Sequence, residues 1–479
     1  MLTCGNARRG QAEGAQLSSL EGPKGLSHLA TPFVASPLLC GNLKTTAQNS
    51  PFGPKTLKSQ VKGYHSSHLK LHVGNSSVRR YTLKVDIERF RGSPIGSLVE
   101  VTVTDGGVDY AHFAYVPNPL PRTFQLSSAT QRLHEEALLA LGRLDGQAGQ
   151  LPEPALLARP AIREEAVSTS ALEGTYSTLP KVFEAEFLED EEMDRPLREV
   201  RNYVRAAERG LVAIREEGSG VTIWLIRGLH EILMEGLGSH PLDVGQARNR
   251  QNWIGLHRGA PITESLFVPP PSGDILTHGL EGWEAWIHDD DIPALVRIAV
   301  GHYQFETLHA FIDGNGRIGR LVAQLQLVEG NLLRFPILNL SPYLEPRGDE
   351  YRDRLRELSA SGEWEPWLLF FLTAIREQAE AASKRTAALL ELREDFIDTA
   401  KKNGIRGVGV EIAAGLIGFP VTTSRFAAEA HDVTYQAANT AIARLEKAGI
   451  LVEVTGKSYG RLFVAARVLD LISPNGPSA

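Results

Sequence analysis

Two hydrophobic patterns alternate along the chain and together predict a mainly helical protein. Apolar and polar residues alternate over 98–103 and again over 110–116, on either side of Asp105-Gly106-Gly107, which predicts a β-hairpin. Most of the following chain repeats apolar positions every three or four residues, which is typical of helices packed on one side. We expect helices over residues 129–144, 161–174, 197–216, 221–234, 349–358 and 373–402.

A glycine-rich turn separates two apolar helical runs in the middle of the chain. The first run, Ile298 to Phe311, holds His302 and His309 at a helical spacing, and the second extends from Ile318 to Val328. Between them, Asp313-Gly314-Asn315-Gly316 contains two glycines that are free to adopt φ > 0. A turn that leads into a helix N-terminus presents unpaired backbone N–H groups, so this stretch predicts an anion site.

Charged side chains around this turn extend the anion site to a nucleotide site. Arg317 and Arg320 are three residues apart, so on a helix they share one face beside the turn. His309 supplies a general base with an ordinary pKa close to neutrality. Asp313 supplies the hard oxygen that Mg²⁺ prefers. The residues therefore predict a base, a metal ligand and binding of several phosphates.

The same stretch resembles the signature of the Fic family, the protein adenylyltransferases, in the pattern His309-x-Phe311-x-Asp313-Gly314-Asn315-Gly316-Arg317-x-x-Arg320. Ala310 stands where the family often has proline, which alters backbone stiffness and no chemical group. The resemblance implies a mainly α fold, with a Fic-type helical core, a β-hairpin flap and a small N-terminal region. It also implies transfer of AMP from ATP, with Mg²⁺, to a Ser, Thr or Tyr hydroxyl of a protein, which could be the chain itself.

The resemblance assigns roles residue by residue. His309 is the catalytic base and Asp313 the metal ligand. The residues implied to bind the nucleotide are Gly314, Asn315, Gly316, Arg317, Ile318, Gly319, Arg320, Tyr351, Ser265, Leu266 and Phe267. The last three lie in an extended segment, 262–268, at the position of the family's flap, where a strand edge pairs with a target peptide. Tyr351 has core packing as its alternative role, and His302 is expected to be a core or supporting residue.

A second motif lies upstream. Thr169 and Glu173 share a helix face four residues apart, just before Gly174. By itself this pattern indicates an ordinary amphipathic helix with a solvated glutamate. Beside the core motif, it resembles the Fic inhibitory helix, whose glutamate pairs with the second arginine, here Arg320. Such a carboxylate occupies the donors that hold the γ-phosphate, so that ATP binds in a pose unfit for transfer.

The C-terminal part has its own pattern, and residues 405–466 resemble a winged helix–turn–helix module. Gln436, Asn439, Thr440 and Arg444 are expected to face a DNA major groove, and Lys457 and Arg461 lie on the wing. The positive charge is modest, so contact with protein is the alternative to DNA. The predicted division is 1–80 tail, 86–192 Fic N-terminal region with the inhibitory helix, 193–375 catalytic core, 376–404 connecting helix and 405–466 winged-helix-like domain.

Composition narrows the classes of protein to which the chain can belong. Hydrophobic residues make up 42% and charged residues 22%, as in globular proteins, and a net charge of −7 gives no global nucleic-acid signal. No apolar run approaches the about 20 residues that cross a bilayer, so no membrane partner is expected. The two cysteines, Cys4 and Cys40, do not suggest a disulfide framework, which fits a reducing cytoplasm.

The first 80 residues differ from the rest. They contain ten Lys or Arg against two Glu and lack periodicity. This composition predicts a disordered tail or an over-extended start, with a targeting or nucleic-acid-binding arm as the alternative.

Several functions are compatible with these patterns. The leading one is an adenylyltransferase autoinhibited by Glu173. A second is a Fic enzyme that removes AMP or transfers another nucleotide. A third is a winged-helix transcriptional regulator that uses the Fic core as a nucleotide sensor, although the intact His309 argues against it. A homodimer is left open.

Overall fold

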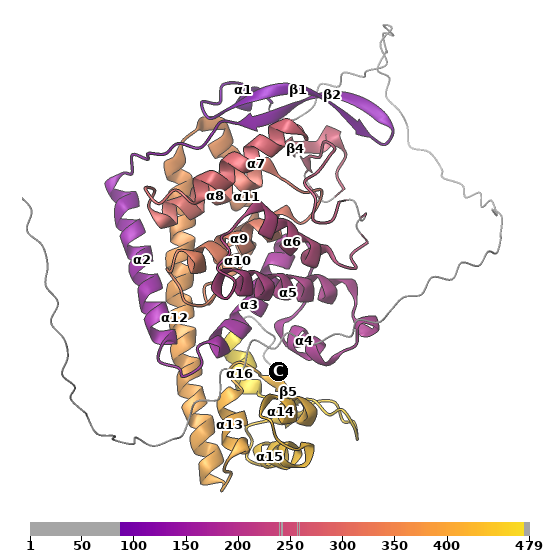
Figure 1. Ribbon diagram of the computed structural model, residues 1–479, viewed down its shortest axis with the longest axis vertical. Helices are drawn as coiled ribbons and strands as arrows, with labels where there is room; N and C mark the ends of the chain where they lie inside the picture. The colour runs from indigo at the N-terminus through magenta and orange to yellow at the C-terminus, as the bar shows by residue number, and fades with distance from the viewer. Residues whose placement is uncertain (1–86, 239, 241–242, 256, 258, 474–479) are drawn as a thin grey trace, which may run out of the picture. The chain divides into compact units, whose positions relative to one another are not determined.

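The computed structural model describes residues 87–473, except 239, 241–242, 256 and 258. The tail predicted for residues 1–80 lies outside this part. Within it, helices predominate and the strands form three small antiparallel sheets (Figure 1). None of the helices described there combines the length and the apolar character that crossing a membrane requires.

The N-terminal region begins with the hairpin expected from the alternating pattern. After α1 (Ile87–Arg91), β1 (Gly96–Asp105) pairs antiparallel with β2 (Val108–Pro117). Gly106 and Gly107 have φ of +57° and +78°, as the two central residues of a type I′ turn require. The predicted hairpin is therefore confirmed.

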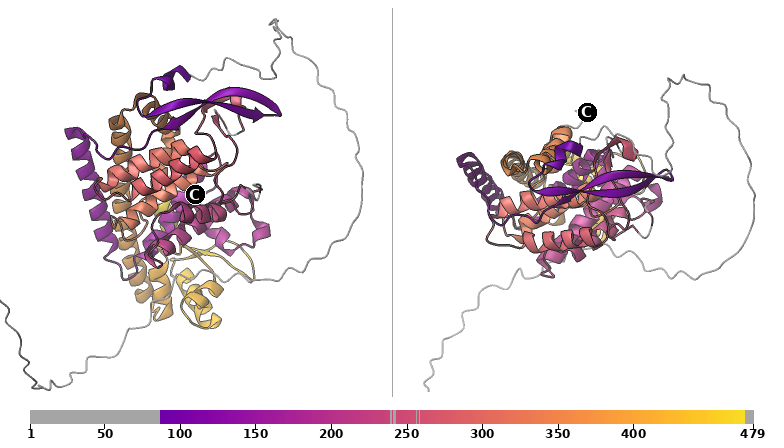
Figure 2. Two further views of the ribbon diagram at one scale, coloured as in Figure 1. Left: turned by 45° about the horizontal axis from the view of Figure 1, so that its top comes forward. Right: turned by 90° about the horizontal axis from the view of Figure 1, so that it is seen from above.

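Two long helices, α2 (Ser128–Ala148) and α12 (Trp364–Lys402), pack side by side along one side of the helical core (Figures 1 and 2). The Ser127 side chain caps α2 by accepting from the Thr130 N–H at 3.2 Å. Helix α12 begins earlier than the expected Thr373. It is also more than the connecting helix predicted for 376–404, because its buried face packs on α2 and α8 as well as on α13.

Shorter helices complete the core around the central pair α8 and α9. Almost every residue of these two helices is buried, including polar side chains such as Gln304 on α8 and Gln324 on α9. The core helices are α3 (Ala155–Leu172), α4 (Leu179–Glu184), α5 (Arg195–Arg215), α6 (Ile223–Met234), α7 (Asp274–Ile287), α8 (Ala294–Leu308), α9 (Asn315–Glu329), α10 (Ser341–Leu344) and α11 (Gly348–Ser361).

The expectation that His302 and His309 share one helix is wrong. Helix α8 ends at Leu308, and His309 follows with φ 49° and ψ 62°, in the left-handed region. Its N–H still donates to the Phe305 carbonyl at 3.1 Å. A side chain in this region costs roughly 1–2 kcal/mol, so the surroundings must hold His309 there.

A second hairpin lies beside the central helices at the position expected for the flap. Strand β3 (Ile254–Gly255) pairs antiparallel with β4 (Ser265–Phe267). The N-terminal hairpin supports it, because the Tyr115 N–H donates to the Val268 carbonyl at 2.8 Å and the Phe267 ring packs 5.6 Å from that of Tyr115. Of the segment predicted to be extended, 262–268, Ser265–Phe267 form a strand of this hairpin, whereas Ile262–Glu264 form a turn of 3-10 helix.

The C-terminal elements follow the end of α12. Short helices precede and separate the strands, which form one antiparallel sheet in the order β5-β7-β6. The Thr423 and Thr434 hydroxyls cap the N-termini of α14 and α15. The elements are α13 (Val408–Gly415), β5 (Val421–Thr422), α14 (Ser424–Ala430), α15 (Tyr435–Lys447), β6 (Val452–Glu453), β7 (Phe463–Val464) and α16 (Ala466–Ile472).

Candidate active site

The turn between α8 and α9 is fixed by its own side chains. Gly314 has φ +82° and stands at the N-cap of α9, a conformation that favours glycine. The Asn315 amide accepts from the Phe311 N–H and donates to the Phe311 carbonyl, both at 2.8 Å. The Asp313 carboxylate accepts from the Gly314 N–H at 2.7 Å. Because the Asn315 side chain is engaged within the turn, the backbone N–H groups of α9 are what this turn offers to an anion.

His309 presents a neutral imidazole at this turn. Burial, together with the nearby Arg248 guanidinium, lowers the pKa of His309 to about 4. Its Nδ1 lies 3.3 Å from the Glu306 carbonyl, which can only accept, so Nδ1 carries the proton. The lone pair of Nε2 is consequently available, which is the state that a general base requires.

Arg248 holds the backbone around His309, and sequence analysis assigned it no role. The buried guanidinium donates to the His309 carbonyl at 2.9 Å and to the Leu308 carbonyl at 3.4 Å. It also donates to the Pro270 carbonyl, close after the flap strand β4. Burial lowers the pKa of Arg248 to about 10. These contacts explain how His309 is kept in its left-handed conformation.

His230, on α6, is a second supporting residue that sequence analysis missed. Its Nδ1 accepts from the Gly245 N–H and its Nε2 donates to the Asp313 carbonyl, both at 2.9 Å. The ring stacks on Phe311 with centroids 3.9 Å apart and planes 6° apart. Burial lowers the pKa of His230 to about 4, so the ring is neutral. It therefore joins α6 to the turn through a fixed tautomer.

Arg320 meets Thr169 and Glu173, as the upstream motif suggested. Its Nε donates to Thr169 Oγ1 at 2.6 Å, and one terminal nitrogen lies 2.7 Å from Glu173 Oε1. Burial alone would raise the pKa of Glu173, but the Arg320 guanidinium outweighs it and lowers that pKa. A Cβ on Gly316 would lie 2.3 Å from Glu173 Oε1, so the carboxylate sits directly against the start of α9.

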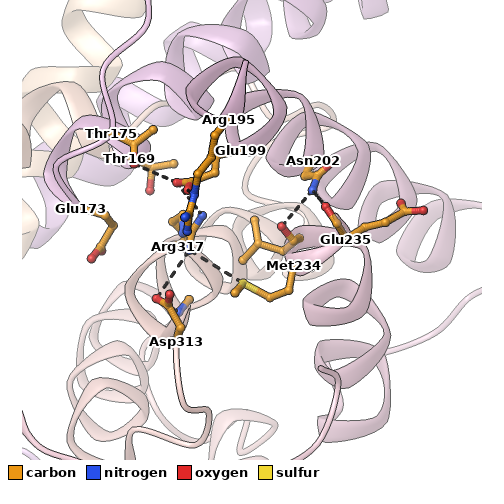
Figure 3. Close-up of polar contacts among 12 residues, drawn as sticks. Thr169, Glu173, Thr175, Arg195, Glu199, Asn202, Met234, Glu235, Asp313 and Arg317 are labelled. Carbon is orange, nitrogen blue, oxygen red and sulfur yellow. Dashed lines mark hydrogen bonds and ion pairs between the residues drawn. The ribbon is translucent and has the colours of Figure 1, made fainter. Parts of the chain in front are cut away.

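Arg317 pairs with Glu199 and Asp313 (Figure 3), whereas Arg320 pairs with Glu173. The Arg317 side chain is buried and lies 3.4 Å from Glu199 Oε2 on α5 and 3.7 Å from Asp313 Oδ1. The two arginines were expected to share one face beside the turn. Instead, Arg320 borders the cavity described below, whereas Arg317 is not part of its lining.

A cavity of about 150 Å³ connects the elements of the site. Its wall is largely apolar, with Leu172, Ile254 and Leu355 among the lining residues. Of the residues singled out in the sequence, it brings together Glu173, Leu266, Phe267, His309, Gly316, Arg320 and Tyr351. An apolar wall with few convergent polar groups is the usual form of a small-molecule site.

The cavity lining does not include the other residues predicted to bind the nucleotide, which are Gly314, Asn315, Arg317, Ser265, Ile318 and Gly319. Ser265 is buried, with its hydroxyl 3.3 Å from the His112 ring on the N-terminal hairpin. Ile318 is fully buried in the core. Gly319 packs so closely on Glu306 that a Cβ would lie 2.4 Å from its carboxylate. Nothing in the sequence of the signature or of the flap distinguishes these buried residues from the residues that line the cavity.

Tyr351 packs in the core and also borders the cavity, so its role in binding a nucleotide stays a prediction. Its hydroxyl lies 2.7 Å from His302 Nε2. His302 Nδ1 lies 3.1 Å from the Gly319 carbonyl, so Nδ1 donates and Nε2 accepts from the tyrosine. Burial lowers the pKa of His302 to about 3. His302 is therefore a supporting residue, as expected.

The carboxylate of Asp313 fits the role of a metal ligand only together with a substrate. Its side chain is 41% exposed, and no group of three or more His, Cys, Asp or Glu residues within the described ranges could hold a metal ion. Mg²⁺ is commonly bound by one or two carboxylates together with substrate phosphates. Asp313 is therefore suited to Mg²⁺ that arrives with a nucleotide.

Comparisons with known proteins agree with the motif. Residues 131–212 match the Fic/DOC family N-terminal model, and residues 220–327 match the Fic/DOC family model. A protein adenylyltransferase Fic of Drosophila erecta is 31% identical over 111 residues, which is 22% of this chain and 20% of that protein. The one from Drosophila grimshawi is 25% identical over 170 residues, 34% of this chain and 31% of that protein. The chain thus spans a third or less of these relatives.

Two solved structures of Fic proteins resemble this chain at low sequence identity. A Fic family protein from Desulfovibrio desulfuricans G20 superimposes with a TM-score of 0.46 at 20% identity, covering 71% of this chain and 97% of that chain. Fic-1 from C. elegans gives a TM-score of 0.42 at 21% identity, covering 55% and 74%. With the complete signature from His309 to Arg320 and matches to both family regions, this chain belongs to the Fic family.

Proposed function

We propose that this protein is an adenylyltransferase that moves AMP from ATP to a Ser, Thr or Tyr hydroxyl of a protein, and that Glu173 restrains it. The observation that carries the proposal is the cavity where His309, the start of α9 and the Glu173–Arg320 pair meet. The adenylyltransferase names of the relatives support AMP as the transferred group.

In the proposed reaction, His309 Nε2 takes the proton from the attacking hydroxyl. The oxygen then attacks the α-phosphorus, and pyrophosphate leaves. The backbone N–H groups of α9 and the Arg320 guanidinium stabilise the charge that develops on the phosphates. Mg²⁺, held by Asp313 and the phosphates, would add positive charge when bound. The flap would align the target segment by pairing with it as a strand, with Leu266 and Phe267 covering the nucleotide.

The restraint follows from competition for one guanidinium. While Glu173 Oε1 lies 2.7 Å from Arg320, that nitrogen is not available to a γ-phosphate. The Glu173 carboxylate also lies against Gly316, where an anion at the start of α9 would bind. In the proposal, the inhibited enzyme therefore holds ATP in an unproductive pose until this contact opens.

The test is incorporation of label from α-labelled ATP into proteins of a cell lysate. Glu173→Gly should raise it, and adding His309→Ala should abolish it. Mass spectrometry of the labelled proteins would identify the target and residue, including self-modification. No label from any nucleotide with Glu173→Gly would refute the transferase function. Removal of AMP from a modified protein by the wild type, but not by Glu173→Gly, would favour the alternative Fic reaction.

A second candidate function concerns residues 405–466, for which we propose a winged-helix-like module that binds DNA. Gln436, Thr440 and Arg444 are exposed at a four-residue spacing on α15, which supports this role. Asn439 differs, because its side chain accepts from the Ser424 hydroxyl at 3.0 Å. A gel shift of the full chain with genomic fragments tests the proposal. The wild type should give a shift that weakens as the salt concentration rises and that Arg444→Ala removes. If no such shift is seen, the module makes protein contacts instead.

Cytoplasmic location and homodimerisation also stay predictions, which cell fractionation and measurement of mass in solution would test.

A further inference from the structure

A buried carboxylate, Glu199, joins two parts of the site that are distant in sequence (Figure 3). Glu199 lies on α5 with 2% of its side chain exposed. Its Oε2 accepts from the Thr175 hydroxyl at 2.8 Å and lies 3.4 Å from the Arg317 guanidinium. The same oxygen thus contacts the segment just after Glu173 and the first arginine of the motif.

The Thr175 contact is well placed to control Glu173. Thr175 follows Glu173 and Gly174 in the turn that ends α3, and its N–H donates to the Ser170 carbonyl at 2.9 Å. Gly174 has φ +81°, so the chain reverses there. The hydrogen bond from the Thr175 hydroxyl to Glu199 then connects the end of this turn to α5 through side chains. Glu173 itself is 39% exposed and is held at its carboxylate by Arg320.

The contact between Arg317 and Glu199 is an ion pair between two buried side chains. Arg317 is fully buried, and a buried charge needs a partner of opposite sign. Within the described part of the chain, Arg317 forms ion pairs with Glu199, which is buried on the neighbouring helix, and with the partly exposed Asp313. Because the Arg317 guanidinium lies 3.4 Å from Glu199 Oε2 and helps to hold it in place, the carboxylate is a well-positioned acceptor for the Thr175 hydroxyl, and a hydrogen bond to a carboxylate is stronger than one to a neutral acceptor.

We propose that Glu199 is a positioning residue that connects the inhibitory turn, 173–175, to Arg317 at the start of α9. Through the Thr175 hydroxyl it keeps Glu173 facing Arg320, so the inhibitory contact depends on a link that does not touch the nucleotide. The inference rests on the proposed function for its activity readout, and a structural readout tests it separately.

The experiment uses Thr175→Val, which removes the hydroxyl and keeps the shape, in the wild type and in Glu173→Gly. Labelling by the single variant should rise about three- to tenfold, because a hydrogen bond to a charged group is lost. In the Glu173→Gly background the same change should alter labelling by less than about twofold, since no inhibitory carboxylate is left to release. Thr175→Ser, which keeps the hydroxyl, should stay at the wild-type level.

Arg195→Gln is the matched control. Arg195 also donates to Glu199, at 3.1 Å, but its side chain is 59% exposed, so its loss should leave labelling within about twofold. Thermal melts verify that all variants fold. Thr175→Val at the wild-type rate, or an equal rise in both backgrounds, would overturn the inference.

Hydrogen exchange separates this inference from the transferase proposal. Amides at the end of α3 should exchange about tenfold faster in Thr175→Val than in the wild type, because the tie to α5 is lost. Arg195→Gln should leave them unchanged. If Glu173→Gly gives no label, the transferase function fails, while unchanged exchange in Thr175→Val would overturn the Glu199 link independently.

Discussion

Loss of the Glu173 carboxylate is the perturbation whose size the structure defines best. One hydrogen bond of 2.7 Å joins it to Arg320, whose side chain is 2% exposed. A hydrogen bond to a charged group contributes about 1.5–3 kcal/mol. Because 39% of the Glu173 side chain is exposed, solvent screening reduces this figure, and we take about 1.5–2 kcal/mol. At about 1.4 kcal/mol per factor of ten, Glu173→Gly should be about 10- to 30-fold faster.

The assay is the initial rate of label incorporation at saturating ATP, with three variants. Glu173→Gly removes the side chain, whereas Glu173→Gln keeps its length but not its charge and should give an intermediate rate. Glu164→Gln is the control: it lies on the same helix but pairs with Arg385, outside the cavity, and should match the wild type. Equal acceleration by Glu164→Gln, or none by Glu173→Gly, would refute the reasoning.

Three further predictions follow from the supporting residues. Burial lowers the pKa of His230, His302 and His309 to about 4, 3 and 4, below the ordinary 6.5. Keeping these rings neutral therefore costs the folded state nothing above pH 6.5, and the free energy of unfolding falls as the pH drops from 6.5 toward 4. Urea titrations across this range should show the fall, and His302→Gln should make the fall smaller. For the same reason, the rate of Glu173→Gly should stay level from pH 8 down to about 6, and a sharp fall near 6.5 would contradict the low pKa of His309. Arg248→Lys should lower kcat about 10- to 100-fold with a smaller change in the KM for ATP, because one ammonium cannot replace contacts to several carbonyls; steady-state kinetics at an unchanged melting temperature would verify it.

The sequence predicted those features that depend on local pattern. Hairpin β1–β2 follows from alternation around Gly106-Gly107, and α2 from the helical spacing of apolar residues over 129–144. These signals are contained in a few neighbouring residues. The contact of Glu173 with Arg320 was expected only through the resemblance to the Fic inhibitory helix, and the structure places it as expected.

The supporting residues could not be predicted, because their partners are far away in sequence and belong mostly to the backbone. Arg248 donates to carbonyls of the turn and the flap, and His230 joins Gly245 to Asp313. Any residue type supplies those backbone groups, so the sequence carries no record of the pairing. The end of α8 was missed for a related reason: the apolar pattern continues to Phe311, although the backbone turns at His309.

The measurement that tests the central claim most directly compares two labelled forms of ATP on purified Glu173→Gly protein and its target. Nucleotidyl transfer breaks the bond between the α- and β-phosphates, so α-label should enter protein and γ-label should appear only in released pyrophosphate. His309→Ala in the same background should lose the α-label. Entry of γ-label, or of neither, would contradict the account of the site from His309 to Arg320 as an adenylyltransferase centre.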